Sequence, residues 1–218
     1  MSAVAILSLA TVAMADDEHE EHYDIGIWND GGVLVTGGWD HDHEELAVAN
    51  LRVFEATFGE DPAFPFSTDE PGIGGVAADL DLPVGSMLQL NITAGLGAWN
   101  GNGFDNSTDL WVTADYGPLS ASTVDGGPLE FLVTDDYDLH PTYTMNGEAR
   151  NGAYLVEMYA SMDGYQSSES FWVVFNLGLD EEEYETAVEW VENNLVPTPA
   201  ALPLLTALGL VARRRKRS

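Results

Sequence analysis

The chain has 218 residues, with 37 Asp or Glu and 7 Lys or Arg, giving a formal net charge of −30 at pH 7. All of the acidic residues lie within residues 16–195, where Arg52 and Arg150 are the only basic ones. Such a charge repels phosphate backbones, which excludes nucleic-acid binding. The absence of cysteine excludes disulfides and thiol catalysis, so the hydrophobic core must hold the fold.

The carboxylates are spread along residues 16–195, and two explanations for them remain open. A surface solvated by carboxylates is typical of a salty habitat, where short Debye lengths screen the repulsion. Alternatively, some of the carboxylates bind divalent cations. We favour the first explanation for most of them, because they are not concentrated in one segment.

The first 15 residues are small and apolar and end in Ala13-Met14-Ala15, an A-x-A pattern typical of signal-peptide cleavage before Asp16. No Lys or Arg precedes this apolar stretch. We interpret residues 1–15 as a signal peptide, and the alternative is a buried first strand.

Within residues 16–195, short segments alternate apolar and polar residues between clusters of Gly, Asn, Asp and Pro. This pattern predicts about ten strands in an all-β domain, a single β-sandwich of jelly-roll-like type without repeats or an internal boundary. The predicted strands are His22–Trp28, Val33–Trp39, Leu51–Phe58, Val76–Leu82, Met87–Thr93, Leu110–Ala114, Leu129–Thr134, Tyr154–Ala160 and Phe171–Asn176.

One amphipathic helix is predicted at the end of this domain. Asp180 is a suitable N-cap, Glu183 stands in the capping-box position, and further acids occupy the first turn. An apolar stripe then predicts the face that packs on the sheet, formed by Tyr184, Ala187, Val188, Val191 and Leu195.

Residues 196–218 differ sharply from the acidic domain. The linker Val196-Pro197-Thr198-Pro199 precedes an apolar stretch over residues 200–212 and then the basic cluster Arg213-Arg214-Arg215-Lys216-Arg217. A helix of that apolar length spans roughly 20 Å, against about 30 Å of bilayer hydrocarbon, which suits a transient anchor. The basic cluster is expected to remain cytoplasmic, leaving the acidic domain outside.

This order of parts resembles the PEP-CTERM sorting signal of Gram-negative bacteria, with Thr198 where that signal usually has Glu. The resemblance implies an exosortase-type processing enzyme as a partner and a hydrophobic anchor helix in the membrane. It also implies export through the inner membrane to the cell envelope or surface.

No enzyme motif stands out along the chain. There is no G-x-S-x-G, H-E-x-x-H, P-loop or dinucleotide fingerprint, and paired carboxylates cannot be singled out among 37 acids. We therefore expect a non-enzymatic protein.

The histidines are the candidate metal ligands. His22 and Asp24 begin the first predicted strand, and His41 and His43 follow the second within an acidic loop. A hairpin of these two strands would bring their far ends together. Imidazole with carboxylate favours zinc, whereas calcium takes oxygen ligands alone and is less expected.

Each of these ligand assignments has a structural alternative. For His41 and His43 it is a solvated loop, for His22 a hydrogen bond at the start of a strand. His140 lies beside Pro141 in an Asp-rich segment, where solvation is favoured over ligation. The loop Asn100–Asp109 lacks calcium-loop spacing and is predicted to be a turn.

An alternative function is a carbohydrate- or matrix-binding module of the cell envelope, with a polysaccharide as its partner. The aromatic residues that could form such a platform are Trp28, Trp39, Trp99, Trp111, Tyr116 and Tyr165.

Three stretches resemble one family among PEP-CTERM proteins, those controlled by a zinc-uptake repressor. They begin with His22-Tyr-Asp-Ile-Gly-Ile-Trp28, continue through Asn50-Leu-Arg-Val-Phe54 and Glu70-Pro-Gly72, and end with Phe171-Trp-Val-Val-Phe-Asn176 and the helix that follows. The resemblance covers roughly residues 22–195. It implies a role in zinc homeostasis without enzymatic activity, and it adds support for zinc at His22 and Asp24.

Overall fold

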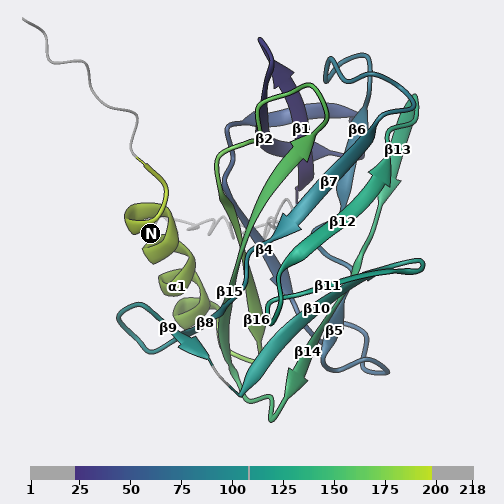
Figure 1. Cartoon of the computed structure of the whole chain (residues 1–218). Helices are drawn as coiled ribbons and strands as arrows, with labels where there is room; N and C mark the ends of the chain where they lie inside the picture. The colour runs from purple at the N-terminus through teal and green to yellow at the C-terminus, as the bar shows by residue number, and fades with distance from the viewer. Residues whose placement is uncertain (1–22, 108, 198–218) are drawn as a thin grey trace, which may run out of the picture.

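The computed structural model describes residues 23–107 and 109–197, and in this part strands dominate, with one helix near the C-terminal end (Figure 1). The predicted all-β class is confirmed. The predicted signal peptide, His22, Thr198, Pro199, the anchor stretch and the basic cluster lie outside the described residues. No helix of the described ranges is long and apolar enough to cross a membrane.

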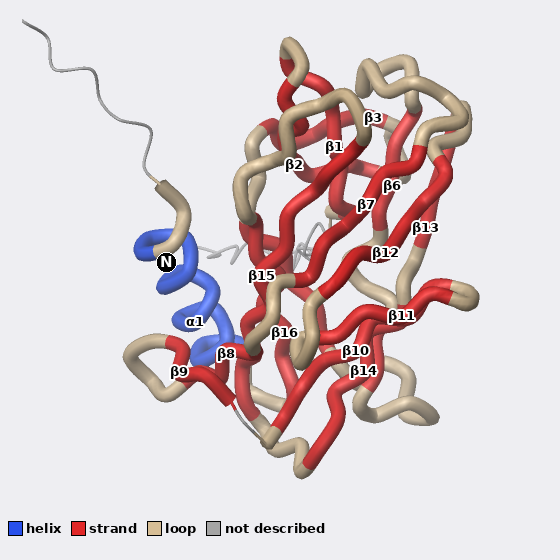
Figure 2. Tube along the Cα trace, in the orientation of Figure 1, coloured by secondary structure: helices blue, strands red, loops and turns tan. Residues whose placement is uncertain are grey.

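Within the described residues, the strands (Figure 2) form four sheets. The largest has the order β12-β7-β15-β16-β4, with β8 and β9 attached beside β15, and the others have the orders β11-β10-β14-β5, β1-β2-β3 and β13-β6. The bounds are β1 (Asp24–Asp30), β2 (Val33–Asp40), β3 (Glu45–Ala49), β4 (Val53–Thr57), β5 (Ser67–Thr68), β6 (Ile73–Val76), β7 (Met87–Ile92), β8 (Leu96–Trp99), β9 (Phe104–Ser107), β10 (Leu110–Tyr116), β11 (Leu119–Ser122), β12 (Gly127–Leu132), β13 (Asp136–Leu139), β14 (Thr142–Gly147), β15 (Gly152–Met162) and β16 (Phe171–Leu177).

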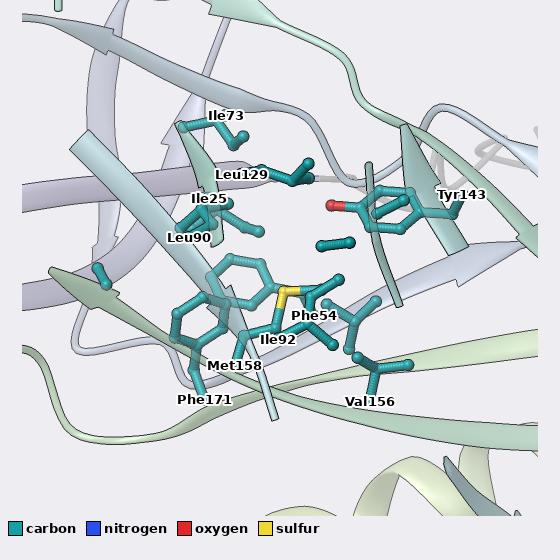
Figure 3. Packing of buried hydrophobic residues seen from close by; sticks show 14 of the residues in the cluster. Ile25, Phe54, Ile73, Leu90, Ile92, Leu129, Tyr143, Val156, Met158 and Phe171 are labelled. Atoms are coloured by element: carbon teal, nitrogen blue, oxygen red, sulfur yellow. The ribbon is translucent and has the colours of Figure 1, made fainter. Parts of the chain in front are cut away.

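Buried side chains from all four sheets meet in one hydrophobic core (Figure 3). Ile25 of β1, Ile73 of β6, Leu129 of β12 and Tyr143 of β14 are each at most 1% exposed. One core therefore unites the four sheets of the described residues.

Helix α1 (Glu181–Asn194) covers the other face of the largest sheet and forms a second cluster. Tyr184, Ala187, Val188 and Val191 are buried against Trp172 and Val174 of β16, and the Tyr184 hydroxyl donates to the Val174 carbonyl at 2.7 Å. β16 is therefore apolar on both faces, which explains its unbroken run Phe-Trp-Val-Val-Phe.

Several local predictions are confirmed. The first two strands form an antiparallel hairpin in which Asp24 pairs with Trp39. The helix starts at Asp180, whose side chain accepts a hydrogen bond from the Glu183 amide at 3.0 Å. The predicted loop Asn100–Asp109 turns only in its first part, where the Asn100 side chain accepts from the amides of Asn102 and Gly103. The prediction is wrong for Phe104–Ser107, which form strand β9 paired with β8.

The predicted strand Val76–Leu82 is wrong. β6 ends at Val76, and the chain then turns, with the Leu80 amide donating to the Val76 carbonyl and Asp81 at a positive φ of 51°. Leu80 and Leu82 are nevertheless buried. The turn packs directly on the core, so buried Leu80 and Leu82 alternate with exposed Asp81 as residues of a strand would.

We expect Asp180→Ala to lower the free energy of unfolding by about 1 kcal/mol, because the first turn of α1 loses its capping acceptor. Chemical denaturation of the full chain measures this change. Glu185→Ala, on the exposed side of the same helix, is the matched control. Equal stability of the two variants would contradict a role for this cap.

Candidate metal site

The start of β1, the start of β6 and the end of β13 lie close together. β6 pairs with β13 so that Ile73 lies opposite Leu139, which places Gly72 and His140 side by side just beyond the pair. The Ile25 amide of β1 donates to the Gly72 carbonyl at 2.9 Å. These backbone contacts bring Asp24, Glu70 and His140 together.

The side chains of these three residues converge. One oxygen each of Asp24 and Glu70 and one ring nitrogen of His140 lie within 4.8 Å of one another. The His140 Nδ1 is 3.6 Å from Glu70 Oε1. Asp24 is 8% exposed, and Glu70 and His140 are half-buried, so the cluster is only partly accessible to solvent.

Gly72 allows this close approach. Its amide donates to Asp24 Oδ1 at 2.9 Å and to Glu70 Oε2 at 3.2 Å, which fixes both carboxylates. A Cβ at this position would lie 2.7 Å from Asp24 Oδ1 and 2.7 Å from His140 Cε1. Any larger residue would therefore push the carboxylate and the imidazole apart.

The His140 ring is oriented from both nitrogens. Nε2 is 2.8 Å from Asp138 Oδ1, and Nδ1 is 3.1 Å from the Asp69 carbonyl oxygen. Burial lowers the pKa of His140, but the Asp69 carbonyl and the carboxylates of Asp24, Glu70 and Asp138 outweigh it, so the pKa is raised. Without a cation, this site favours the doubly protonated imidazole.

The surroundings of the two carboxyl groups disfavour their charged forms, whereas those of His140 favour its charged form. Burial raises the pKa of Asp24, and the charge on His140 only partly offsets this. Burial and the charge of Asp24 raise the pKa of Glu70. Both shifts mean that negative charge at the site is under-compensated, which a bound cation would correct.

Among the residues predicted from sequence, Asp24 and His140 are brought together. The Asp-rich segment before His140 is strand β13 and not a solvated loop, because Asp136–Leu139 pairs with β6. His41 stands at the edge of the cluster, with its Nε2 3.6 Å from Asp138 Oδ2.

His43 lies apart from the cluster. Its Nδ1 contacts Asp40 Oδ2 at 2.7 Å across a local turn, and the side chain is exposed. This hydrogen bond and the charge of Asp40 raise the pKa of His43. The arrangement matches the solvated-loop alternative for His43.

Glu70 is the member of the cluster that sequence reasoning missed. It is one acid among 37, and no spacing marks it as a ligand. The one available signal is the Glu-Pro-Gly sequence, in which glycine permits tight packing behind the acid.

Comparison with known proteins adds no relative: no protein-family model and no curated protein matches the chain. The resemblance to PEP-CTERM proteins therefore remains a prediction that rests on its motifs.

We expect Asp24→Asn to stabilise the metal-free protein at neutral pH, because the folded state no longer has to ionise a buried carboxyl group. Since the folded-state pKa of Asp24 is raised, its stabilising contribution is complete below roughly pH 4 and is lost as pH rises through that raised pKa. The difference between variant and wild type should vanish in acid and grow towards neutrality. Thermal unfolding across pH in a chelator measures it.

The exposed substitution Asp163→Asn is the control for this pH series. Lower stability of Asp24→Asn at every pH would contradict the assigned cost of the buried charge.

Proposed function

We propose that this chain is an exported, surface-sorted, non-enzymatic protein that binds zinc through Asp24, Glu70 and His140. The observation that carries the proposal is the convergence of three ligand atoms within 4.8 Å. Export and sorting are supported by the sequence patterns of residues 1–15 and 196–218.

Zinc is the cation that this donor set favours. One imidazole nitrogen and two carboxylate oxygens form a mixed set that zinc accepts, with a further position for water or for a fourth ligand such as His22. Calcium requires six or more oxygens, and magnesium a near-octahedral oxygen shell. The hydrogen bond from His140 Nε2 to Asp138 supplies the carboxylate–histidine support typical of zinc sites.

Binding at His140 competes with a proton. Nδ1 lies 3.6 Å from Glu70 Oε1, and it must be deprotonated to act as a ligand. Because the pKa of His140 is raised, zinc affinity should fall as the pH drops below that pKa. Such a site would collect zinc at neutral pH and release it in acid.

The acidic surface supports the same role. With 37 carboxylates on the chain, the local concentration of cations around the protein is raised, which speeds their capture at low ionic strength. We further propose that the sheets are arranged as one β-sandwich, an assignment supported by their shared core.

We expect the full chain to bind one zinc ion per molecule, and His140→Ala or Glu70→Ala to weaken binding by at least about tenfold through loss of one ligand. Isothermal titration with zinc measures stoichiometry and affinity. His43→Ala, outside the cluster, is the matched control. A separate His22→Ala variant tests whether that residue supplies a fourth ligand.

Two results would overturn the zinc assignment. One is a stoichiometry below one at micromolar zinc, and the other is unchanged affinity in both His140→Ala and Glu70→Ala. Thermal unfolding gives an independent measure, since zinc at a hundredfold excess over its Kd should add about 2.7 kcal/mol of stability.

We expect replacement of the basic cluster Arg213–Arg217 by Ser to reduce retention of the chain in the membrane fraction, because the cytoplasmic stop is lost. Fractionation of a bacterial host with an exosortase system, followed by immunoblotting, measures this. Replacement of Glu181 and Glu182 by Ser is a control that changes charge outside the tail. An unchanged membrane fraction would argue against sorting by this segment.

A further inference from the structure

Helix α1 covers only part of the outer face of the largest sheet. Val53 of β4, Leu155 in the first half of β15 and Trp172 of β16 belong to the cluster beneath the helix. The second half of β15 and its neighbours β7 and β12 lie side by side beyond that cluster (Figure 1). On these three strands the side chains that alternate with the buried core residues point outward. We call them the outer patch, and they are Met87, Gln89, Asn91, Pro128, Glu130, Leu132, Tyr159 and Ser161.

A chain of side-chain hydrogen bonds crosses the middle of the outer patch. The strand register places Gln89 opposite both Glu130 and Ser161. Gln89 Nε2 donates to Glu130 Oε1 at 2.7 Å, and Ser161 Oγ donates to Gln89 Oε1 at 3.1 Å. Asn91 Nδ2 donates to Ser161 Oγ at 2.9 Å. These bonds hold the polar groups of three strands in fixed directions before any ligand arrives.

Tyr159 places an aromatic ring on the same surface. The register sets it directly opposite Asn91, and it lies two residues before Ser161 on β15, so the three side chains leave the sheet on one side. Directly opposite residues of an antiparallel pair have Cβ atoms about 5 Å apart. Tyr159 is 37% exposed. An accessible ring therefore stands beside the fixed polar groups.

Polar atoms of the outer patch remain available to a ligand. Within residues 23–107 and 109–197, no hydrogen bond involves Asn91 Oδ1, Glu130 Oε2 or the Tyr159 hydroxyl. The two oxygens accept, and the hydroxyl both donates and accepts. Glu130 is the one charged residue of the outer patch, although the chain as a whole is strongly acidic. The patch therefore suits an uncharged ligand with many hydroxyl groups.

From this arrangement we infer that the outer patch binds an uncharged polysaccharide, with one sugar ring packed on Tyr159 and hydroxyls bonded to Asn91 and Glu130. Sugar hydroxyls both donate and accept, and the apolar face of a sugar ring can pack on an aromatic ring. The distance from β15 across β7 to β12 is about 10 Å, which is wider than one sugar ring and suits a polymer.

The composition of the outer patch argues against two other occupants. The large negative charge of the chain repels an acidic polysaccharide. A second copy of the chain carries the same charge and would be repelled too. The centre of the patch is a polar row, whereas the buried centre of an interface between identical chains is mainly apolar.

We expect the full chain, in the presence of a chelator, to bind at least one of immobilised β-glucan, mannan, galactan and chitin, and not the acidic polygalacturonate. Tyr159→Ala and Asn91→Ala should each weaken binding by about tenfold, through loss of the packed ring or of a hydrogen-bond acceptor. Phe64→Ala is the matched control, because Phe64 is an exposed aromatic residue in the loop between β4 and β5. Its affinity should equal that of the wild type.

The inference is overturned by binding to no neutral polysaccharide, by binding to polygalacturonate alone, or by unchanged affinity in Tyr159→Ala. Tyr159 is exposed, so this variant keeps the test decisive even if Asn91→Ala fails to fold. A stable dimer in analytical ultracentrifugation that Tyr159→Ala separates would also overturn it, because a second copy would then cover the patch. Because the chelator removes zinc, a failure here is separate from a failure of the metal site.

Discussion

Strand β16 is buried on both faces, and the two hydrophobic clusters of the molecule are built on its two sides. Val173 and Phe175 point into the core shared by the four sheets, and Trp172 and Val174 face α1. This burial must offset the mutual repulsion of the many carboxylates on the surface. Because the chain has no cysteine, no disulfide restrains the fold. Its stability therefore depends on the burial of this strand and its neighbours.

The candidate metal site is organised around one glycine. Three chain segments meet at Gly72, whose carbonyl accepts from β1 and whose amide donates to both acidic side chains. Two carboxyl groups with raised pKa values and a histidine with a raised pKa share one small volume. The metal-free cluster thus holds a proton where the zinc-bound cluster would hold a metal ion.

The elements that could be predicted from the sequence are those specified by local pattern. The first hairpin follows from alternation around Gly31-Gly32, and α1 follows from its cap and its apolar stripe. Asp24 stood out because it begins a predicted strand. The other members of its cluster could not be placed with it, because Glu70 and His140 reach Asp24 only through the pairing of β6 with β13.

The short strands escaped prediction for the same reason. β5 has two residues, and β13 has four with only Tyr137 fully buried, so neither carries a recognisable period. Conversely, the apolar residues of the turn after Val76 recur with the period of a strand, but the backbone of the turn forms local hydrogen bonds, such as Leu80 amide to Val76 carbonyl. Burial pattern alone does not distinguish a strand from a turn that packs on the core.

The parallel pairing of β4 with β16 has a consequence for the order in which the chain can fold. Val53–Thr57 can join the largest sheet as its edge strand only after Trp172–Asn176, near the end of the described residues, have formed β16. Pairings this distant in sequence make folding slow. The largest sheet is therefore completed only when nearly all of the described chain is available for pairing.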